Sequence, residues 1–176
     1  MLAKDIAIMA EGIQRLGRKI PDTPGQLMVL ARLLLIISRR LEERLAQQLA
    51  SHRLNHSELV TLMFLYIQPD HVATPTELCA VTWEGNSNMT RIANTLIERG
   101  LIERAPSPTD RRRVMIGITP AGSCFVRKLV PTMFPVLHKL FDGFNAANLA
   151  QLNRLLIRLA SNVDRLQTDE PKAGPR

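Results

Sequence analysis

The stretch that decides the fold covers residues 86–122 and reads NSNMTRIANTLIERGLIERAPSPTDRRRVMIGITPAG. Its first part predicts an amphipathic helix, because its apolar residues recur at helical spacing: Met89, Ile92, Ala93, Leu96 and Ile97. Gly100 is a typical end for such a helix. Two β-branched segments, 101–105 and 114–119, then flank a segment rich in proline, aspartate and arginine. The stretch therefore predicts a helix followed by a β-hairpin with a basic tip.

Two shorter helices are expected upstream of this stretch. The first covers about residues 57–67, with Ser57 and Glu58 at its acidic, capping end. The second opens with Thr74-Pro75-Thr76-Glu77, in which threonine caps the helix, proline takes the first position and glutamate the third. The order helix, helix, helix, β-hairpin is that of a winged helix-turn-helix.

Long amphipathic segments flank this module on both sides. Residues 26–49 predict one long helix, preceded by a shorter periodic stretch, and residues 149–163 predict another. Between the hairpin and the last helix, a further helix is interrupted by Pro131 and Pro135. A module of about 75 residues cannot bury all these apolar faces by itself, so we expect an intertwined homodimer.

The expected fold is therefore mainly α with a small β-hairpin wing. We divide the chain into an N-terminal extension (1–24), a dimerisation helix (25–52), a winged helix-turn-helix DNA-binding domain (53–120), C-terminal dimerisation helices (121–166) and a flexible tail (167–176).

Composition narrows the choice of partner. The chain has 176 residues and a net charge of +7, which favours a polyanion such as nucleic acid or an anionic membrane surface. No apolar run approaches the roughly 20 residues that cross a bilayer. The N-terminus lacks a secretory core and only two cysteines occur, so we expect a cytoplasmic protein without membrane partners. Seven aromatic residues are few for a single-strand stacking platform, which favours double-stranded DNA.

The basic charge is concentrated in the decisive stretch and just beyond it. Residues 91–128 hold eight basic residues against three acidic ones, a surplus of five. In a helix-turn-helix, the outward residues of the second helix face base edges and phosphates. The expected DNA contacts from the helix are Ser87, Asn88, Thr90, Arg91 and Asn94, and those from the wing are Asp110, Arg111, Arg112 and Arg113. A solvated polar helix face and a solvated charge run are the plain alternatives for these two features.

The same residues resemble the multiple-antibiotic-resistance regulator (MarR) family. The matching positions are Thr90-Arg91, Leu96, Gly100-Leu101, Asp110 with Arg112, and Ile118-Thr119 with Gly122. Within the family, the chain looks most similar to multidrug-efflux repressors. The resemblance implies a homodimer on a pseudo-palindromic operator, with Arg91 contacting the DNA backbone or a base, Arg112 in the minor groove and Asp110 orienting the wing. Trp83-Glu84-Gly85 departs from the small residues usual in the turn.

The family also suggests control by a small phenolic or lipophilic aromatic effector. We expect an apolar cleft with a few polar groups as its site. The candidate lining residues are Met28, Arg32, His52, Met63, Tyr66 and Trp83, each of which is also compatible with a plain core or surface position.

Other chemistry finds little support. His52 and His56 have the spacing of metal ligands on a helix, but His71 and His138 complete no recognisable set. Cys79 and Cys124 are expected as buried thiols, and the sequence leaves open whether either has a redox role. No metal, cofactor or catalytic residue is predicted. We therefore expect a ligand-responsive transcriptional repressor of efflux or detoxification genes; the alternatives are a sequence-nonspecific architectural DNA-binding protein and, on charge alone, an enzyme.

Overall fold

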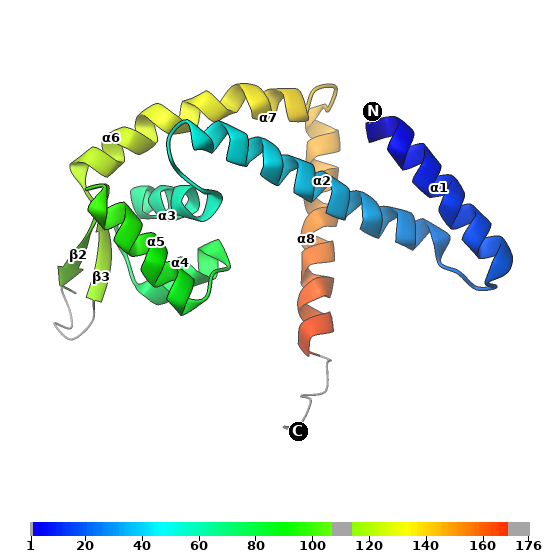
Figure 1. Ribbon diagram of the computed structural model, residues 1–176, viewed down its shortest axis with the longest axis horizontal. Helices are drawn as coiled ribbons and strands as arrows, with labels where there is room; N and C mark the ends of the chain where they lie inside the picture. Colours follow the sequence, from blue (N-terminus) through cyan, green and yellow to red (C-terminus); the bar gives the residue numbers. More distant parts are fainter. Residues whose placement is uncertain (1, 107–113, 169–176) are drawn as a thin grey trace. The chain divides into compact units, whose positions relative to one another are not determined.

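The computed structural model describes residues 2–106 and 114–168 and is mainly helical (Figure 1). The helices are α1 (Leu2–Lys19), α2 (Gly25–Ala50), α3 (His56–Ile67), α4 (Pro75–Thr82), α5 (Asn86–Glu98), α6 (Pro120–Leu129), α7 (Phe134–Leu140) and α8 (Ala146–Thr168), with a 3-10 turn, η1 (Val130–Met133), after α6. The strands are β1 (Val72–Ala73), β2 (Ile102–Pro106) and β3 (Val114–Ile118). The predicted fold class, mainly α with a β-hairpin, is confirmed.

The chain divides into two compact units, residues 1–129 and residues 130–176. The first unit holds α1 to α6 and the sheet, and the second holds η1, α7 and α8. The apolar core of the first unit comes from α3, α4, α5 and the strands, and its fully buried side chains include Leu62, Leu65, Leu78, Ile92, Leu96 and Ile102. Burying one such side chain contributes roughly 1.5–3 kcal/mol, so packing rather than propensity holds these short helices in place.

Helix α3 begins with a capping box that is centred on Asn55. The Asn55 Oδ1 accepts from the Glu58 N–H at 2.8 Å, and the Glu58 Oε2 accepts from the Asn55 N–H at 2.9 Å. The sequence predicts Ser57 and Glu58 at the capping end of this helix, and for Ser57 this prediction is wrong. Its hydroxyl instead donates to Glu84, 27 residues further along the chain.

The sheet has three antiparallel strands in the order β1-β3-β2. The predicted hairpin pairs Ile102 with Ile118 and Pro106 with Val114. Strand β1 pairs Val72 with Gly117 and was not predicted from the sequence. A strand of two residues is too short to show the alternating pattern by which strands are recognised in a sequence, so β1 is evident only from the structure.

A close backbone approach joins the sheet to α6. The Thr119 hydroxyl donates to the Gly100 carbonyl at 2.8 Å and accepts from the Gly122 N–H at 3.0 Å. A Cβ on Gly122 would overlap the Leu101 carbonyl oxygen and lie 2.8 Å from Cγ1 of Ile118. Glycine at position 122 is therefore what lets α6 pack against the loop before β2.

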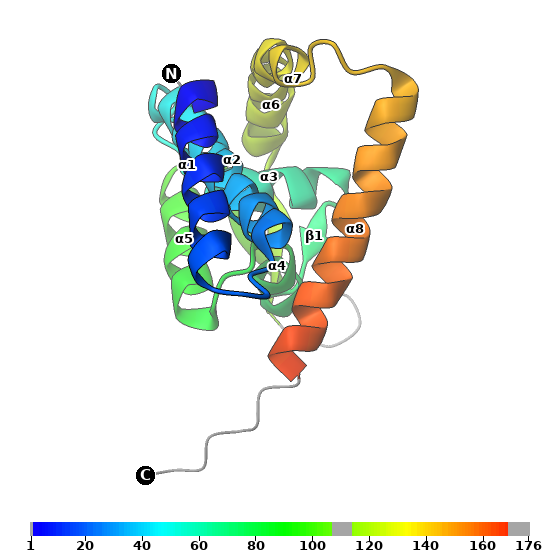
Figure 2. The same ribbon diagram turned by 90° about the vertical axis from the view of Figure 1, so that its right-hand side faces the viewer.

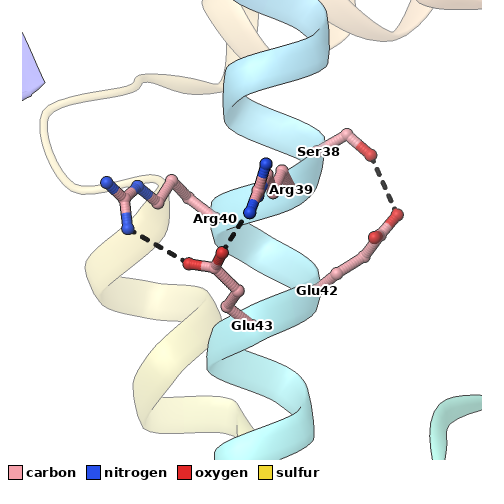
Figure 3. A network of polar contacts seen from close by, with 5 residues as sticks. All are labelled: Ser38, Arg39, Arg40, Glu42 and Glu43. Atoms are coloured by element: carbon pink, nitrogen blue, oxygen red, sulfur yellow. Dashed lines mark hydrogen bonds and ion pairs between the residues drawn. The ribbon is translucent and has the colours of Figure 1, made fainter. Parts of the chain in front are cut away.

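Helices α1 and α2 form a contacting pair within the first unit (Figure 2). Charged pairs along α2 join Glu43 to Arg39 at 3.2 Å and to Arg40 at 3.1 Å, and Ser38 donates to Glu42 (Figure 3). Because these pairs are exposed, they are typical of a solvated helix face. Large apolar side chains of α2 are exposed as well: Leu27, Leu30, Leu34, Leu35 and Ile37.

The second unit begins with the interruption that the prolines predicted. Pro131 lies in η1, and Pro135 takes one of the first two positions of α7. Helix α8 carries a row of exposed apolar side chains at steps of three and four: Leu156, Leu159, Val163 and Leu166. In the described parts of the chain, no helix combines the length and apolarity needed to cross a membrane.

Candidate nucleic-acid interface

Helix α5 has one buried and one polar face, as its sequence predicted. Met89, Ile92, Ala93 and Leu96 are buried. Of the five expected DNA contacts on this helix, Asn88 is half-buried, and the others are exposed: Ser87, Thr90, Arg91 and Asn94. Four apolar side chains thus fix the rotation of the helix, and the polar groups are left on its outer side.

The turn into α5 is set by the preceding helix. Thr74 and Glu77 form the predicted capping box at the start of α4, with Pro75 in the first turn. Helix α4 ends at Thr82, and the next residue, Trp83, has a left-handed backbone conformation with φ 58°. This conformation is unusual for a bulky residue, and it reverses the chain so that α5 starts at Asn86.

A chain of hydrogen bonds runs from this turn onto the outer face of α5. The Asn88 amide donates to one oxygen of Glu84, while Ser57 donates to the other. Arg91 donates to the Asn88 Oδ1 from Nε at 3.0 Å and from Nη2 at 2.8 Å. The bonds from Ser57 and then Asn88, with the nearby charge of Arg91, lower the pKa of Glu84. Asn88 and Arg91, two of the predicted DNA contacts, are therefore held in fixed positions. Glu84 was not predicted as a site residue, because Ser57, which bonds to it, lies 27 residues away in sequence.

The β-hairpin is connected to the outer face of α5 through Arg104. This arginine of β2 donates from Nη2 to the Asn94 Oδ1 at 3.1 Å. The four residues predicted as wing contacts, Asp110, Arg111, Arg112 and Arg113, lie outside the described residues. In the part of the wing that the structure describes, the contact between Arg104 and Asn94 holds β2 beside α5.

Arg99 is turned toward the protein rather than along the outer face. Its guanidinium donates to the Arg53 carbonyl at 2.8 Å and to the His52 carbonyl at 3.0 Å, and it lies 5.7 Å from the centre of the Phe125 ring. The His52 ring meets Phe125 edge-on at 6.2 Å. Arg99 therefore contributes to the basic surplus of the sequence, but it ties the end of α5 to the turn before α3 and to α6.

A cavity of about 290 Å³ lies between α4, α5 and the two hairpin strands. Its lining is largely apolar, with a few polar groups: Pro75, Cys79, Asn86, Met89, Thr90, Ala93, Arg104, Val114 and Ile116. None of the six predicted effector residues lines this cavity. A molecule bound there would contact both α5 and the hairpin.

The six predicted effector residues are spread over several elements. Met28 and Arg32 are exposed on α2, and Met63 on α3 is exposed as well. Tyr66 stacks on His71 at 6.1 Å between ring centres. Trp83 is 87% exposed on the turn before α5. Their role in effector binding stays a prediction.

The two cysteines are half-buried, so the expectation of buried thiols is wrong. In α4 the fully buried position belongs to Leu78, and the next residue, Cys79, is turned to the edge, where its Sγ lies 3.4 Å from the Asn86 Oδ1. In α6 Val126 takes the buried face beside Cys124. Among the described residues, no group of three or more histidine, cysteine, aspartate or glutamate side chains has the arrangement of a metal site.

Comparisons with known proteins agree with this geometry. The model of the MarR family matches residues 52–113. The transcriptional repressor MprA of Escherichia coli K12, also called EmrR, is 31% identical over 148 residues, 84% of each chain. The resemblance inferred from the sequence, to the MarR family and within it to EmrR, is confirmed.

Two solved structures share the fold. A mutant form of Escherichia coli MarR in complex with operator DNA has a TM-score of 0.67 and 22% identity, covering 78% of this chain and 98% of that one. Bordetella bronchiseptica BpsR, described for regulation of its DNA binding by 6-hydroxynicotinic acid, has a TM-score of 0.65 and 23% identity, covering 74% and 91%. The helix order, the outward polar face of α5 and the relationship to MprA lead to one conclusion: the chain belongs to the MarR family of winged helix-turn-helix transcriptional regulators.

Proposed function

We propose that the protein is a homodimeric, sequence-specific repressor that is released from a pseudo-palindromic operator by a small phenolic or lipophilic aromatic ligand. Its targets are efflux or detoxification genes, and it has no catalytic role. The observation that carries the proposal is the outer face of α5, where hydrogen bonds hold Asn88 and Arg91 in fixed positions. A surface that bound phosphates alone would need charge but no such order.

Sequence-specific binding follows from the types of side chain on this face. Asparagine pairs with adenine and arginine with guanine through two hydrogen bonds each in the major groove, and each such pair discriminates by about 1–3 kcal/mol. Asn88, Arg91 and Asn94 supply these groups within two turns of one helix. The wing arginines, Arg111 to Arg113, would add contacts in the minor groove.

Dimerisation is supported by the apolar residues that the single chain leaves exposed. The exposed rows on α2 and α8 are too extensive for isolated surface residues. A second copy would cover them and would place two α5 helices for half-sites about one helical turn apart.

Ligand control is supported by the cavity between α5 and the hairpin. Its volume of about 290 Å³ is near the lower limit for small-molecule sites. A ligand weakens DNA binding only if it favours a different arrangement of the reading elements. A molecule that contacts both Met89 of α5 and Ile116 of β3 satisfies this condition, because the helix and hairpin must then adjust around it. The description of BpsR, whose DNA binding is regulated by 6-hydroxynicotinic acid, supports ligand control by analogy, and the relationship to the repressor MprA supports repression.

The test is fluorescence anisotropy on the promoter DNA upstream of the protein's own gene, with excess random duplex and increasing salicylate. We expect selective binding that salicylate relieves, and less relief in Ala93→Leu, which fills part of the cavity. Selective binding that neither salicylate nor a panel of lipophilic phenols relieves would contradict ligand control. Equal binding to promoter and random duplex, with a steep salt dependence, would favour the architectural alternative.

A further inference from the structure

In the chain of hydrogen bonds from Ser57 through Glu84 and Asn88 to Arg91, each group has a fixed role as donor or acceptor. It links three elements: the first turn of α3, the turn before α5 and the first two turns of α5. The bonds from Ser57 and Asn88 to the two Glu84 oxygens are both 2.5 Å. The last link has Arg91 donating twice to the Asn88 Oδ1.

The chemistry of the two ends determines how the amide between them is oriented. A carboxylate only accepts hydrogen bonds, and a guanidinium only donates them. Asn88 must therefore turn its NH₂ group toward Glu84 and its Oδ1 toward Arg91, because the flipped amide would oppose two donors at one end and two acceptors at the other. A neutral group in place of the carboxylate would remove the constraint at this end of Asn88 and leave only the one that Arg91 imposes.

Several features keep Glu84 charged and in place. It lies just before the N-terminus of α5 and is bonded to the second residue of α3, and both helix ends favour a negative charge. A glutamate is ionised at neutral pH, and the bonds from Ser57 and then Asn88 lower the pKa of Glu84 further. The charge has a cost for DNA binding, since it lies beside the surface that would approach phosphates.

We infer that Glu84 is a specificity-determining positioning residue, which orients the Asn88 amide and through it the Arg91 guanidinium for reading purine base edges in the major groove. This inference rests on the proposed operator binding. Glu84 itself contacts no base in this account. It lowers the affinity for any DNA by its charge, and it raises the discrimination between sequences by allowing one arrangement of donors and acceptors.

Glu84→Gln separates these two effects. The variant is nearly isosteric and can still accept from Ser57, but it has lost the charge and no longer dictates the orientation of Asn88. Removing one charge about 10 Å from a phosphate should strengthen binding to random duplex by about twofold. Losing one ordered base contact should lower the ratio of operator to random affinity by on the order of tenfold.

The experiment starts from a duplex library randomised over about 20 base pairs, two helical turns of DNA. Selection with the wild-type protein gives the operator, and affinities for this operator and for an unrelated duplex are then measured for wild type, Glu84→Gln, Asn88→Ala and the double variant. Because Glu84 acts through Asn88, Glu84→Gln should change the affinity ratio no further once Asn88 is alanine. A loss of folded protein would lower both affinities equally and leave their ratio unchanged.

Glu98→Gln is the matched control. It removes an exposed carboxylate from the other end of α5, about 15 Å from Asn88 along the helix, and should leave the ratio unchanged. Ser57→Ala removes the tether on the other side of Glu84 and should give a smaller decrease than Glu84→Gln.

The outcomes distinguish the two claims. A selective wild type whose ratio is unchanged in Glu84→Gln overturns the inference alone, as does an equal decrease with and without Asn88. Failure of the wild type to select any sequence overturns the proposed function and the inference together. Trp83 is the only tryptophan of the sequence and adjoins Glu84, so its fluorescence should change on DNA binding in every variant that still docks this turn.

Discussion

Gly122 has no room for a side chain, so the addition of a single methyl group at this position should destabilise the fold. Gly122→Ala should lower the free energy of unfolding by about 1–3 kcal/mol, since its Cβ would overlap the Leu101 carbonyl oxygen. Urea unfolding measures the change. Gly12→Ala in α1 is the control, because nothing lies within 4 Å of its added Cβ, and it should be neutral or slightly stabilising. Equal effects of the two variants would contradict the close approach.

Arg99 is expected to stabilise the fold rather than to contact DNA. Arg99→Gln should lower the free energy of unfolding by about 1–3 kcal/mol, because it disrupts charged hydrogen bonds to the carbonyls of His52 and Arg53. The slope of log affinity for operator DNA against log salt should stay unchanged, since Arg99 neutralises no phosphate. A decrease of the slope by about one, as expected for a phosphate-binding arginine, would show that Arg99 reaches DNA.

Individual residues also show what sequence patterns can and cannot predict. The outward positions of Ser87, Thr90, Arg91 and Asn94 followed from helical periodicity, which fixes the face opposite Met89 and Ile92. The partners of Arg99 and Glu84 did not follow, because they lie 46 and 27 residues away in sequence and only the folded chain brings them together.

Helix α4 depends on its capping box, and the box is sensitive to acid. Hydrogen bonds from the backbone N–H and then the hydroxyl of Thr74 lower the pKa of Glu77 below its ordinary value of 4.5. The carboxylate therefore stabilises the folded state above pH 4.5, and this contribution is lost as the pH falls through the folded pKa. Thr74→Ala should cost about 1 kcal/mol at pH 7.

The cost of Thr74→Ala should shrink as the pH is lowered from neutral, past 4.5 and through the lowered folded pKa of Glu77, because Glu77 becomes protonated and half of the box is lost in both proteins. Urea unfolding of wild type and variant across this range measures the difference. Thr76→Ala, an exposed change in the same turn, should show neither the cost nor its pH dependence. A cost for Thr74→Ala that is independent of pH would contradict the role of the Glu77 carboxylate.

The helices and the hairpin were predictable as elements, and their connections were less so. Apolar periodicity predicted α2, α3 and α5 to within a residue or two of each end. The short strand β1 was missed, since its pairing with β3 depends on residues more than 40 positions away. Local patterns specify helices and a hairpin, whereas pairing between strands that are distant in sequence is set by the tertiary structure.

We expect the apolar row on α8 to form part of the interface between two chains. The double substitution Leu156→Glu and Leu159→Glu places two charges on this row, where both residues are exposed in the single chain. We expect the protein to change from dimer to monomer in analytical ultracentrifugation while retaining its helical circular dichroism. Gln151→Glu and Ser161→Glu add the same two charges to exposed polar positions of the helix and serve as the control. A dimer that survives the leucine substitutions would exclude this face from the interface.

The central claim is that α5 reads DNA sequence. Its most direct test is competition between the selected operator and random duplex, measured by fluorescence anisotropy for wild type and Arg91→Ala. We predict that the wild type prefers the operator by at least about 10³-fold and that Arg91→Ala loses about 1–3 kcal/mol of this preference. A wild type without preference, or a preference unchanged by Arg91→Ala and Asn88→Ala together, would contradict the account.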